Sequence, residues 1–303
     1  MKRWVKQDAN EKLFVNIRKV GDNNEAKFWI NVTQVPRRSD VKCCSVCVKP
    51  VYGDQMTLHK VAEFIAHYRV VGARTFFLYD LAMSAELKAL LAVFQSAGID
   101  VTVVHSKLPV NSTLTFMYGQ MEVLEDCIYR STAKSEWFLY VDYDELIMPL
   151  RLPTLPGILN ITGTRMGSAR VGSIIFQSRS YCQEYGANIS SIAKGEAPLA
   201  TRLYSLFKST GIWGKYIARA RSISKPGIHK IAKLCCGARQ IMVSTREAVS
   251  NHYRRCCHLG FMKHLLPFDV WKTDDLREEK AVARFTKLAE NDLAMTIVRS
   301  IIK

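Results

Sequence analysis

From residue 41 to residue 141 the sequence alternates between short apolar runs and longer stretches in which apolar residues recur at helical spacing. The apolar runs have the composition of buried strands and cover residues 46–48, 75–80, 99–104 and 137–141. The stretches with helical spacing cover residues 57–71, 84–98 and 114–129. Strands that alternate with helices form a parallel sheet covered by helices. We therefore predict an α/β fold with a mostly parallel central sheet flanked by helices.

The rest of the chain lacks this alternation. Residues 1–40 are predicted to form an N-terminal extension with one or two peripheral strands and a linker. The main domain is predicted to span residues 41–265. Its C-terminal half is expected to be more irregular, because prolines interrupt the pattern soon after Glu145. Residues 266–303 are predicted to form a C-terminal helical segment that packs on the main domain.

The fourth predicted strand ends in three carboxylates, Asp142, Asp144 and Glu145. In an open α/β sheet, ligands bind just beyond the carboxyl ends of the strands. Asp142 and Asp144 are two residues apart, so on an extended chain both side chains would leave the same face. Two such oxygen ligands suit Mg²⁺ or Mn²⁺ that carries a diphosphate. The alternative is a strand that runs into a solvated acidic turn.

The net charge of the 303-residue chain is +16, from 43 Lys and Arg against 27 Asp and Glu. Such a balance favours anionic partners: nucleic acid, anionic membrane surfaces, or phosphorylated and acidic sugars. The basic residues are scattered, and the sequence carries no zinc finger, ribonucleoprotein aromatic motif or basic helix. No dedicated nucleic-acid binding is therefore predicted, although a basic nucleic-acid-binding protein remains an alternative. The glycine-rich motifs of dinucleotide-binding folds and P-loop NTPases are also absent.

Nine cysteines and four N-x-S/T sequons indicate an oxidising secretory lumen. A zinc site is the weaker alternative, because Cys44 and Cys47 form one C-x-x-C spacing without a matching second pair. Cys127 is expected to be a small core residue or half of a disulfide. The sequence has no apolar run long enough to span a bilayer, and its first residues lack the apolar core of a signal peptide. We interpret the chain as a fragment whose membrane anchor lies outside it.

Several blocks of sequence, in order, resemble glycosyltransferase family 92, a group of nucleotide-sugar transferases with the GT-A fold. The blocks include Phe77-Leu78-Tyr79-Asp80, Gln120 with Glu125-Asp126-Cys127, Trp137 to Glu145, Lys225-Pro226-Gly227-Ile228-His229 and Asn251-His252-Tyr253-Arg254. This resemblance implies a metal-dependent enzyme that moves a hexose, with galactose as the donor sugar, from a UDP-sugar to a glycan hydroxyl with inversion. It also implies a Golgi or secretory-lumen location, as a type II membrane protein in full-length form. Two departures are that Tyr143 stands where the family more often has an aliphatic residue, and that residues 150–215 do not align.

The resemblance also implies roles for the acidic motif. Asp142 and Asp144 would bind Mn²⁺ or Mg²⁺, which neutralises the departing nucleoside diphosphate, and Asp144 would be the more direct, catalytic ligand. Glu145 would orient these ligands, or else be a surface turn residue. His252 is the first candidate for a third ligand and His229 is the alternative, although either histidine could be structural instead.

Other residues are candidates for contacts with the acceptor and the donor. The inverting base is expected among the carboxylates of the C-terminal half, where Glu184 is preferred over Glu196 although its spacing does not single it out. The candidates for donor binding are Lys49, Asp80, Gln120, Asp126 and Arg130. The first two could equally be surface residues. The last two lie one helical turn apart and could form an ion pair with no role in binding.

Two further functions remain open at this level. An inactive relative of the same fold would bind glycans or nucleotides, but the intact Asp142 and Asp144 argue against it. A nucleotidyltransferase would also use paired carboxylates on an α/β sheet, yet it would be expected to carry segments that track nucleic acid.

Overall fold

The computed structural model describes residues 3–7, 13–17, 30–32, 42–52, 56–106, 114–166, 171–182, 205–207, 214–254 and 276–302. The chain forms two compact units, Met1–Asp40 and Val41–Lys303. In the first unit, β1 (Arg3–Gln7), β2 (Leu13–Ile17) and β3 (Ile30–Val32) make a small antiparallel sheet. Strands were expected in this extension, and the structure describes three where one or two were predicted.

The second unit is built on an eight-stranded sheet in the order β16-β10-β13-β8-β4-β6-β5, with β7 also paired to β6. Its strands are β4 (Lys42–Val48), β5 (Val51–Tyr52), β6 (Thr75–Ala82), β7 (Asp100–His105), β8 (Ser135–Val141), β10 (Val171–Phe176), β13 (Lys215–Arg219) and β16 (Arg239–Met242). Every pair is parallel except the two that β13 makes, with β8 and with β10. The predicted α/β class with a mostly parallel central sheet is confirmed.

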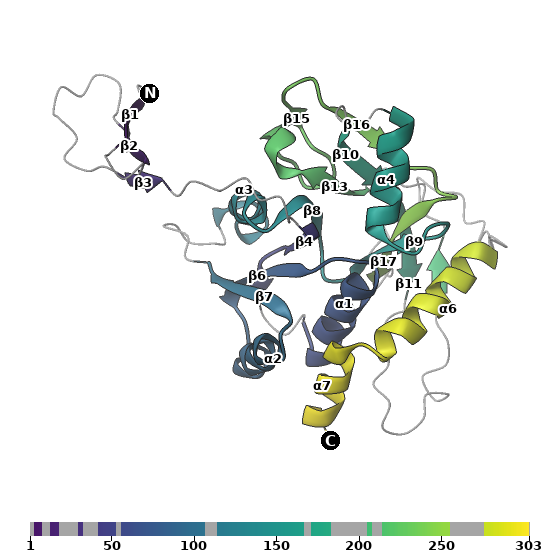
Figure 1. Cartoon of the computed structure of the whole chain (residues 1–303). Coiled ribbons are helices and arrows are strands. Elements are labelled where there is room, and N and C mark those ends of the chain that lie inside the picture. Colours follow the sequence, from purple (N-terminus) through teal and green to yellow (C-terminus); the bar gives the residue numbers. More distant parts are fainter. Residues whose placement is uncertain are drawn as a thin grey trace. The chain divides into compact units, whose positions relative to one another are not determined.

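Helices cover both faces of this sheet (Figure 1). They are α1 (Leu58–Val70), α2 (Ala85–Ser96), α3 (Gln120–Thr132), α4 (Leu155–Met166), α6 (Leu276–Glu290) and α7 (Leu293–Ile302). Helix α3 packs on one face, against alternate strand residues such as Phe138 and Tyr140. Helices α1, α2, α4, α6 and α7 share the core on the other face, which includes Leu139 and Val141. The period-2 alternation along β8 therefore feeds two cores.

The ends of the first helices follow from local chemistry. Thr57 and Ser84 each accept a hydrogen bond from the backbone three residues on, which caps α1 and α2. Gly72 follows α1 with a φ of 105°, a conformation that side chains with a Cβ rarely adopt. An apolar stripe of α2, Leu87, Leu90, Leu91 and Phe94, is buried, as its spacing predicts.

Two expectations about the elements are wrong. The helix predicted over 114–129 begins only at Gln120, because Met117 and Gly119 take positive φ values of 47° and 82° and interrupt the coil. The chain after Glu145 is also more regular than expected. It continues as β9 (Glu145–Pro149) and α4, because Pro156 falls in the first turn of α4, where a missing N–H costs no helical hydrogen bond.

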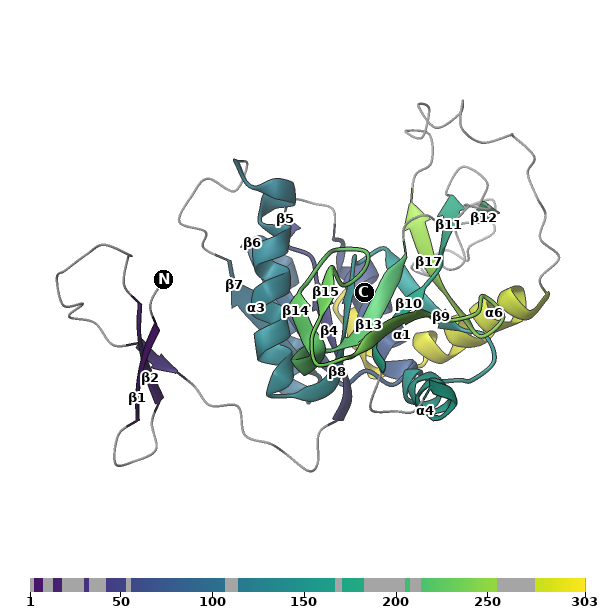
Figure 2. The ribbon, with the colours of Figure 1, turned by 90° about the horizontal axis from the view of Figure 1, so that it is seen from above.

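A second sheet, in the order β12-β11-β17-β9, extends the fold beside the first (Figure 2). Besides β9 it contains β11 (Ser178–Cys182), β12 (Ser205–Phe207) and β17 (Ala248–Arg254). Strands β14 (Ile223–Lys225) and β15 (Lys233–Leu234) form a separate hairpin. Helices α6 and α7 pack on α1, where Arg69 and Asp292 form an ion pair of 3.0 Å.

Two disulfides lie within the described residues. Cys47 of β4 is joined to Cys127 of α3, and Cys43 to Cys44. The expectation that Cys127 is half of a disulfide is confirmed, and the C-x-x-C spacing of Cys44 and Cys47 serves two disulfides instead of a zinc ion. None of the described helices has the length and apolar character needed to cross a membrane.

Candidate metal and donor site

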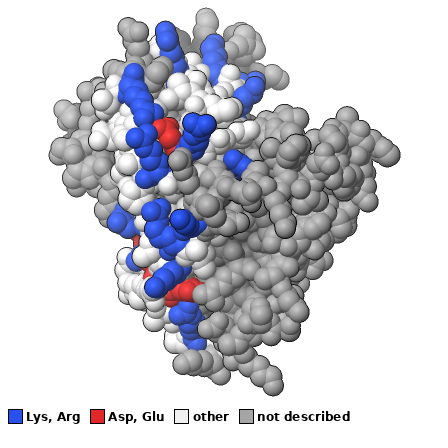
Figure 3. Space-filling view, turned by 90° about the vertical axis from the view of Figure 1, so that its right-hand side faces the viewer, with Lys and Arg blue, Asp and Glu red and all other residues white. Residues whose placement is uncertain are grey.

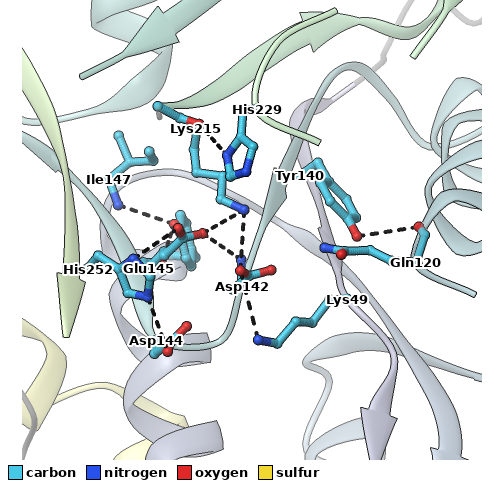
Figure 4. A network of polar contacts seen from close by, with 12 residues as sticks. Lys49, Gln120, Tyr140, Asp142, Asp144, Glu145, Ile147, Lys215, His229 and His252 are labelled. Atoms are coloured by element: carbon cyan, nitrogen blue, oxygen red, sulfur yellow. Dashed lines mark hydrogen bonds and ion pairs between the residues drawn. The ribbon is translucent and has the colours of Figure 1, made fainter. Parts of the chain in front are cut away.

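The acidic motif lies at the carboxyl edge of the parallel strands (Figure 4). Strands β4 and β8 are parallel, and their last residues, Val48 and Val141, are paired. The residues that follow them, Lys49 and Asp142, therefore leave the sheet side by side, and Lys49 Nζ lies 3.8 Å from Asp142 Oδ2. The register of two strands thus brings together a lysine and an aspartate that are 93 positions apart in the sequence (142 − 49).

The motif itself is a turn. The N–H of Glu145 donates to the carbonyl of Asp142 at 3.0 Å, which closes a four-residue turn between β8 and β9. The premise that Asp142 and Asp144 share a face of an extended chain is therefore wrong. The turn places both carboxylates at the same edge, but each meets a different set of cations.

Glu145 is the inner residue of the motif and is almost fully buried. Its Oε2 accepts the backbone N–H of Asp142 at 2.9 Å and lies 3.0 Å from the ammonium of Lys215. Its Oε1 lies 3.5 Å from Nδ1 of His252. Glu145 thus contacts the backbone of one aspartate and the two cationic partners of the motif.

His252 reaches the motif from β17, because it is the residue paired with Glu145 across the β17–β9 ladder. Its Nε2 lies 3.3 Å from Asp144 Oδ2. Burial lowers the pKa of His252, but the hydrogen bond to Asp144 and the charges of Glu145 and Asp144 raise it above its ordinary value overall. Burial would raise the pKa of Asp144, but His252 and then Lys49 lower it to about 2. Asp144 is therefore a carboxylate at neutral pH.

Lys215 is a site residue that the sequence did not single out. It opens β13, whose Tyr216 is paired with Tyr140 of β8, so its side chain arrives at the carboxyl end of β8. Its Nζ lies 3.4 Å from Asp142 Oδ2, besides its contact with Glu145. Burial lowers the pKa of Lys215, but Glu145 and Asp142 raise it above its ordinary value, so it remains a cation. The signal in the sequence that could have pointed to Lys215 is its place directly before a short apolar run.

The residues present fit a divalent cation. Within the part of the chain that the structure describes, Oδ1 of Asp142 and Oδ1 of Asp144 are buried and have no hydrogen-bond partner. Buried carboxylate oxygens normally have partners, and oxygen ligands are those that Mg²⁺ and Mn²⁺ prefer. No three His, Cys, Asp or Glu side chains among the described residues form a ready-made metal cluster. The protein would therefore supply few ligands, as is usual where substrate phosphates and water complete the coordination.

His229 and Gln120 also lie in this region (Figure 4). Nδ1 of His229 lies 3.3 Å from the carbonyl of Gly214, and burial followed by the charge of Lys215 lowers the pKa of His229. Gln120 begins α3, and its backbone carbonyl accepts a long hydrogen bond of 3.5 Å from the hydroxyl of Tyr140.

The other donor-binding candidates contact protein groups away from this network. Asp80 forms ion pairs with Lys88 at 2.9 Å and with His105 at 3.3 Å. Asp126 pairs with Arg130 at 2.5 Å and accepts the hydroxyl of Tyr79 at 2.6 Å, so the predicted ion pair within α3 is present. The base candidates Glu184 and Glu196 lie outside the described residues.

Comparison with known proteins places the chain in a family. The sequence model described as glycosyltransferase family 92 matches residues 42–295. The chain belongs to glycosyltransferase family 92. A β-1,4-galactosyltransferase of Caenorhabditis elegans, galt-1, is 24% identical over 112 residues, which are 35% of this chain and 25% of that protein. The chain therefore matches about a quarter of the length of this curated relative.

Solved structures with similar folds share little sequence with this chain. TarS of Staphylococcus aureus (residues 1–349) is 11% identical with a TM-score of 0.40, over 84% of this chain and 73% of that one. The mannosyltransferase PcManGT of Pyrobaculum calidifontis, solved with GDP-Man and Mn²⁺, is 13% identical with a TM-score of 0.40, over 87% and 68% of the two chains. Both TM-scores are below 0.5, so the roles of the site residues rest on the contacts within this chain.

Proposed function

We propose that this chain is a glycosyltransferase that depends on Mn²⁺ or Mg²⁺ and moves galactose from a UDP-sugar to a hydroxyl of a glycan, with inversion. The observation that carries the proposal is the pair of buried, unpartnered Oδ1 atoms of Asp142 and Asp144 at the carboxyl edge of the sheet. A strand end is where α/β folds bind nucleotides and phosphates. Membership of family 92 supports a sugar nucleotide as the ligand.

Each residue of the site has a role in this proposal. Asp142 and Asp144 hold the metal, and His252 becomes a third ligand only by exchanging its contact with Asp144 Oδ2 for the cation. A bound divalent cation would stabilise the negative charge that develops on the departing diphosphate. Lys49 is 22% exposed, lies next to Asp142 and sits 4.6 Å over the ring of Tyr143, so its ammonium can turn toward a phosphate at the edge. Glu145 holds the turn that presents both aspartates.

Galactose and the location of the protein are supported by other observations. The name of the Caenorhabditis elegans relative supports galactose as the sugar that is moved. The disulfide between Cys47 and Cys127 and the four sequons support the lumen of the Golgi or another secretory compartment, with a membrane anchor in the full-length protein. A glycan hydroxyl in that lumen is the proposed acceptor.

The test is hydrolysis and transfer from a panel of UDP-sugars, with and without Mn²⁺, by the wild type, Asp144→Asn and Asp100→Asn. Asp144→Asn is expected to lose at least about a hundredfold in rate, because it weakens the site that stabilises the leaving group. Asp100→Asn is the matched control. Its carboxylate lies at the other end of the parallel strands, bonded to Thr75 at 2.9 Å, and it should keep full activity.

Other results would assign a different function. Wild-type protein that binds UDP but transfers no sugar from any donor would indicate an inactive binding relative. Affinity for nucleic acid that collapses with salt and ignores metal would indicate the basic nucleic-acid-binding alternative. The proposal fails if Asp144→Asn turns over as fast as the wild type and if the wild type turns over equally fast with and without Mn²⁺.

A further inference from the structure

Lys215 differs from Lys49 in its access to solvent. The side chain of Lys215 is 1% exposed, against 22% for Lys49, although both ammonium groups lie near Asp142 Oδ2. Taking an ammonium out of water costs several kcal/mol unless carboxylates surround it. Lys215 meets that condition with Asp142 and Glu145, so the fold holds it at one place.

The strand that carries Lys215 is fixed by close backbone approach. Gly214 precedes it, and a Cβ on Gly214 would lie 2.4 Å from the carbonyl oxygen of Phe176 in β10. Glycine thus lets the start of β13 press against β10 while Tyr216 keeps its register with Tyr140 of β8. Two strand pairings fix the backbone of Lys215, and burial and the two carboxylates restrict its ammonium.

Lys215 and Lys49 both lie next to Oδ2 of Asp142, and Lys215 is the nearer of the two. Oδ2 of Asp142 faces Lys215 at 3.4 Å, and Oδ1 is the buried oxygen without a partner. The same cation binds Glu145, which in turn accepts the N–H of Asp142. Asp142 is therefore held at its carboxylate and at its backbone by one buried pair.

We propose that Lys215 is a positioning residue for the metal, a role that rests on the proposed function of the site. Its buried Nζ forms ion pairs with both Asp142 Oδ2 and Glu145 Oε2, so that Asp142 presents Oδ1 to the cation before the donor binds. Its charge also lowers the repulsion among the three carboxylates of the motif while no metal is bound. Lys215 does not touch the donor, because two carboxylates and the sheet enclose it, whereas Lys49 remains free to do so. Partners of this kind typically change metal affinity by about 10- to 100-fold when removed.

The experiment compares wild type with Lys215→Met/Glu145→Gln, which replaces the buried charges on both sides by neutral side chains of similar length. Mn²⁺ affinity, with and without UDP, is measured from the electron paramagnetic resonance signal of free Mn²⁺, and the melting temperature is measured on the same samples. We expect Mn²⁺ affinity to fall about 10- to 100-fold while the melting temperature stays within a few degrees. A merely structural role would move the melting temperature and leave the metal affinity of the folded variant unchanged.

Three further variants separate the contributions. Glu145→Gln alone shows how much of the loss of Mn²⁺ affinity in the double variant comes from Glu145, which itself accepts the N–H of Asp142. Lys215→Arg keeps a cation between the two carboxylates and should retain most of the Mn²⁺ affinity if the position of the charge is what matters. Lys233→Met removes an exposed lysine of β15 and should bind Mn²⁺ as the wild type does. Affinity in the double variant that equals that of wild type, or that of Glu145→Gln, overturns the role of Lys215 alone. The proposed function fails separately, if wild type and Asp144→Asn bind Mn²⁺ equally.

Discussion

His67 is a buried histidine that the fold holds neutral. Its Nε2 lies 2.9 Å from the carbonyl of Ile147, to which it donates, and its ring packs against Phe285 of α6. Burial lowers the pKa of His67 to about 4, from an unfolded value of 6.5. Above pH 6.5 both states are neutral and the full stability is present. As the pH falls from 6.5 through 4 the unfolded state takes up the proton first, so stability is lost, by roughly 3 kcal/mol in total.

The predicted consequence is a flatter pH profile in His67→Gln, which keeps a donor for Ile147 but cannot be protonated. Denaturant unfolding between pH 7.5 and 4.5 should show the wild type losing about 2.5 kcal/mol more than this variant over that interval. The control is Lys60→Gln, an exposed position of the same helix, and it should follow the wild-type profile. Parallel profiles for wild type and His67→Gln would contradict the assignment.

Of the residues that meet at the site, the acidic motif was predicted from local pattern, Lys49 and His252 were named as candidates, and Lys215 was missed. Asp142, Asp144 and Glu145 follow one apolar run, so their place at a strand end could be predicted from local pattern alone. Lys215 matters only because β13 runs antiparallel to β8, and that pairing joins segments about 80 residues apart without a local signal. The turn geometry was missed for a similar reason, since alternation in a strand does not say where the strand stops.

At the scale of elements, a disulfide ties the sheet to the helix that covers it. Cys47 of β4 and Cys127 of α3 are 80 residues apart in the sequence, and both are fully buried. A loop of that length is expected to stabilise the fold by about 4 kcal/mol through the unfolded state. Cys47→Ala/Cys127→Ala should therefore melt roughly 10 °C below the wild type in a thermal scan.

The control for the disulfide is Cys235→Ala, because Cys235 is a free thiol. This variant should melt with the wild type. Reducing agent should lower the melting temperature of the wild type more than that of the double alanine variant, which keeps the Cys43–Cys44 disulfide. An equal melting temperature for wild type and double variant would show that the link adds no stability.

Replacement of Gly214 is predicted to disturb the strand that carries Lys215. In Gly214→Ala the new Cβ would meet backbone, the carbonyl oxygen of Phe176, which cannot rotate away. We expect a loss of at least about 2 kcal/mol in denaturant unfolding, because β13 must move away from β10. Gly157→Ala is the matched control in α4, where the nearest atoms lie at 3.4 Å and alanine favours the helix. That variant should be neutral or slightly stabilised.

The elements that sequence analysis predicted best are those with strong local signals. The helical spacing over residues 57–71 and 84–98 predicted α1 and α2 closely. Helix α4 was missed because prolines were taken as breaks, although Pro156 falls in its first turn. The second sheet could not be predicted, because β17 pairs with β9 and β11 across long stretches of sequence.

At the scale of the whole molecule, the described residues carry an excess of basic side chains on one face (Figure 3). Arg151 and Arg165 both pair with one carboxylate, that of Glu247. The chain as a whole has 16 more basic than acidic residues. The acidic motif is therefore an exception to the general charge of the protein. Long-range attraction favours an anionic nucleotide, while the carboxylates at the edge favour a cation.

The two compact units give the last prediction. The candidate site is built from residues of the unit Val41–Lys303, so a chain that begins at Val41 should fold and keep the Mn²⁺ affinity of the full chain. Removal of residues 276–303, in contrast, should destabilise the fold and lower the Mn²⁺ affinity. Phe285, Met295 and Val298 of α6 and α7 are buried in the core that includes α1, and their loss would expose apolar surface on the sheet side of the molecule. Melting temperature, sedimentation and Mn²⁺ titration on both truncations check this contrast. A soluble, cooperative chain that ends at residue 275 would contradict the place given to α6 and α7 in the core, and loss of Mn²⁺ affinity on removal of residues 1–40 would contradict a site contained in the larger unit.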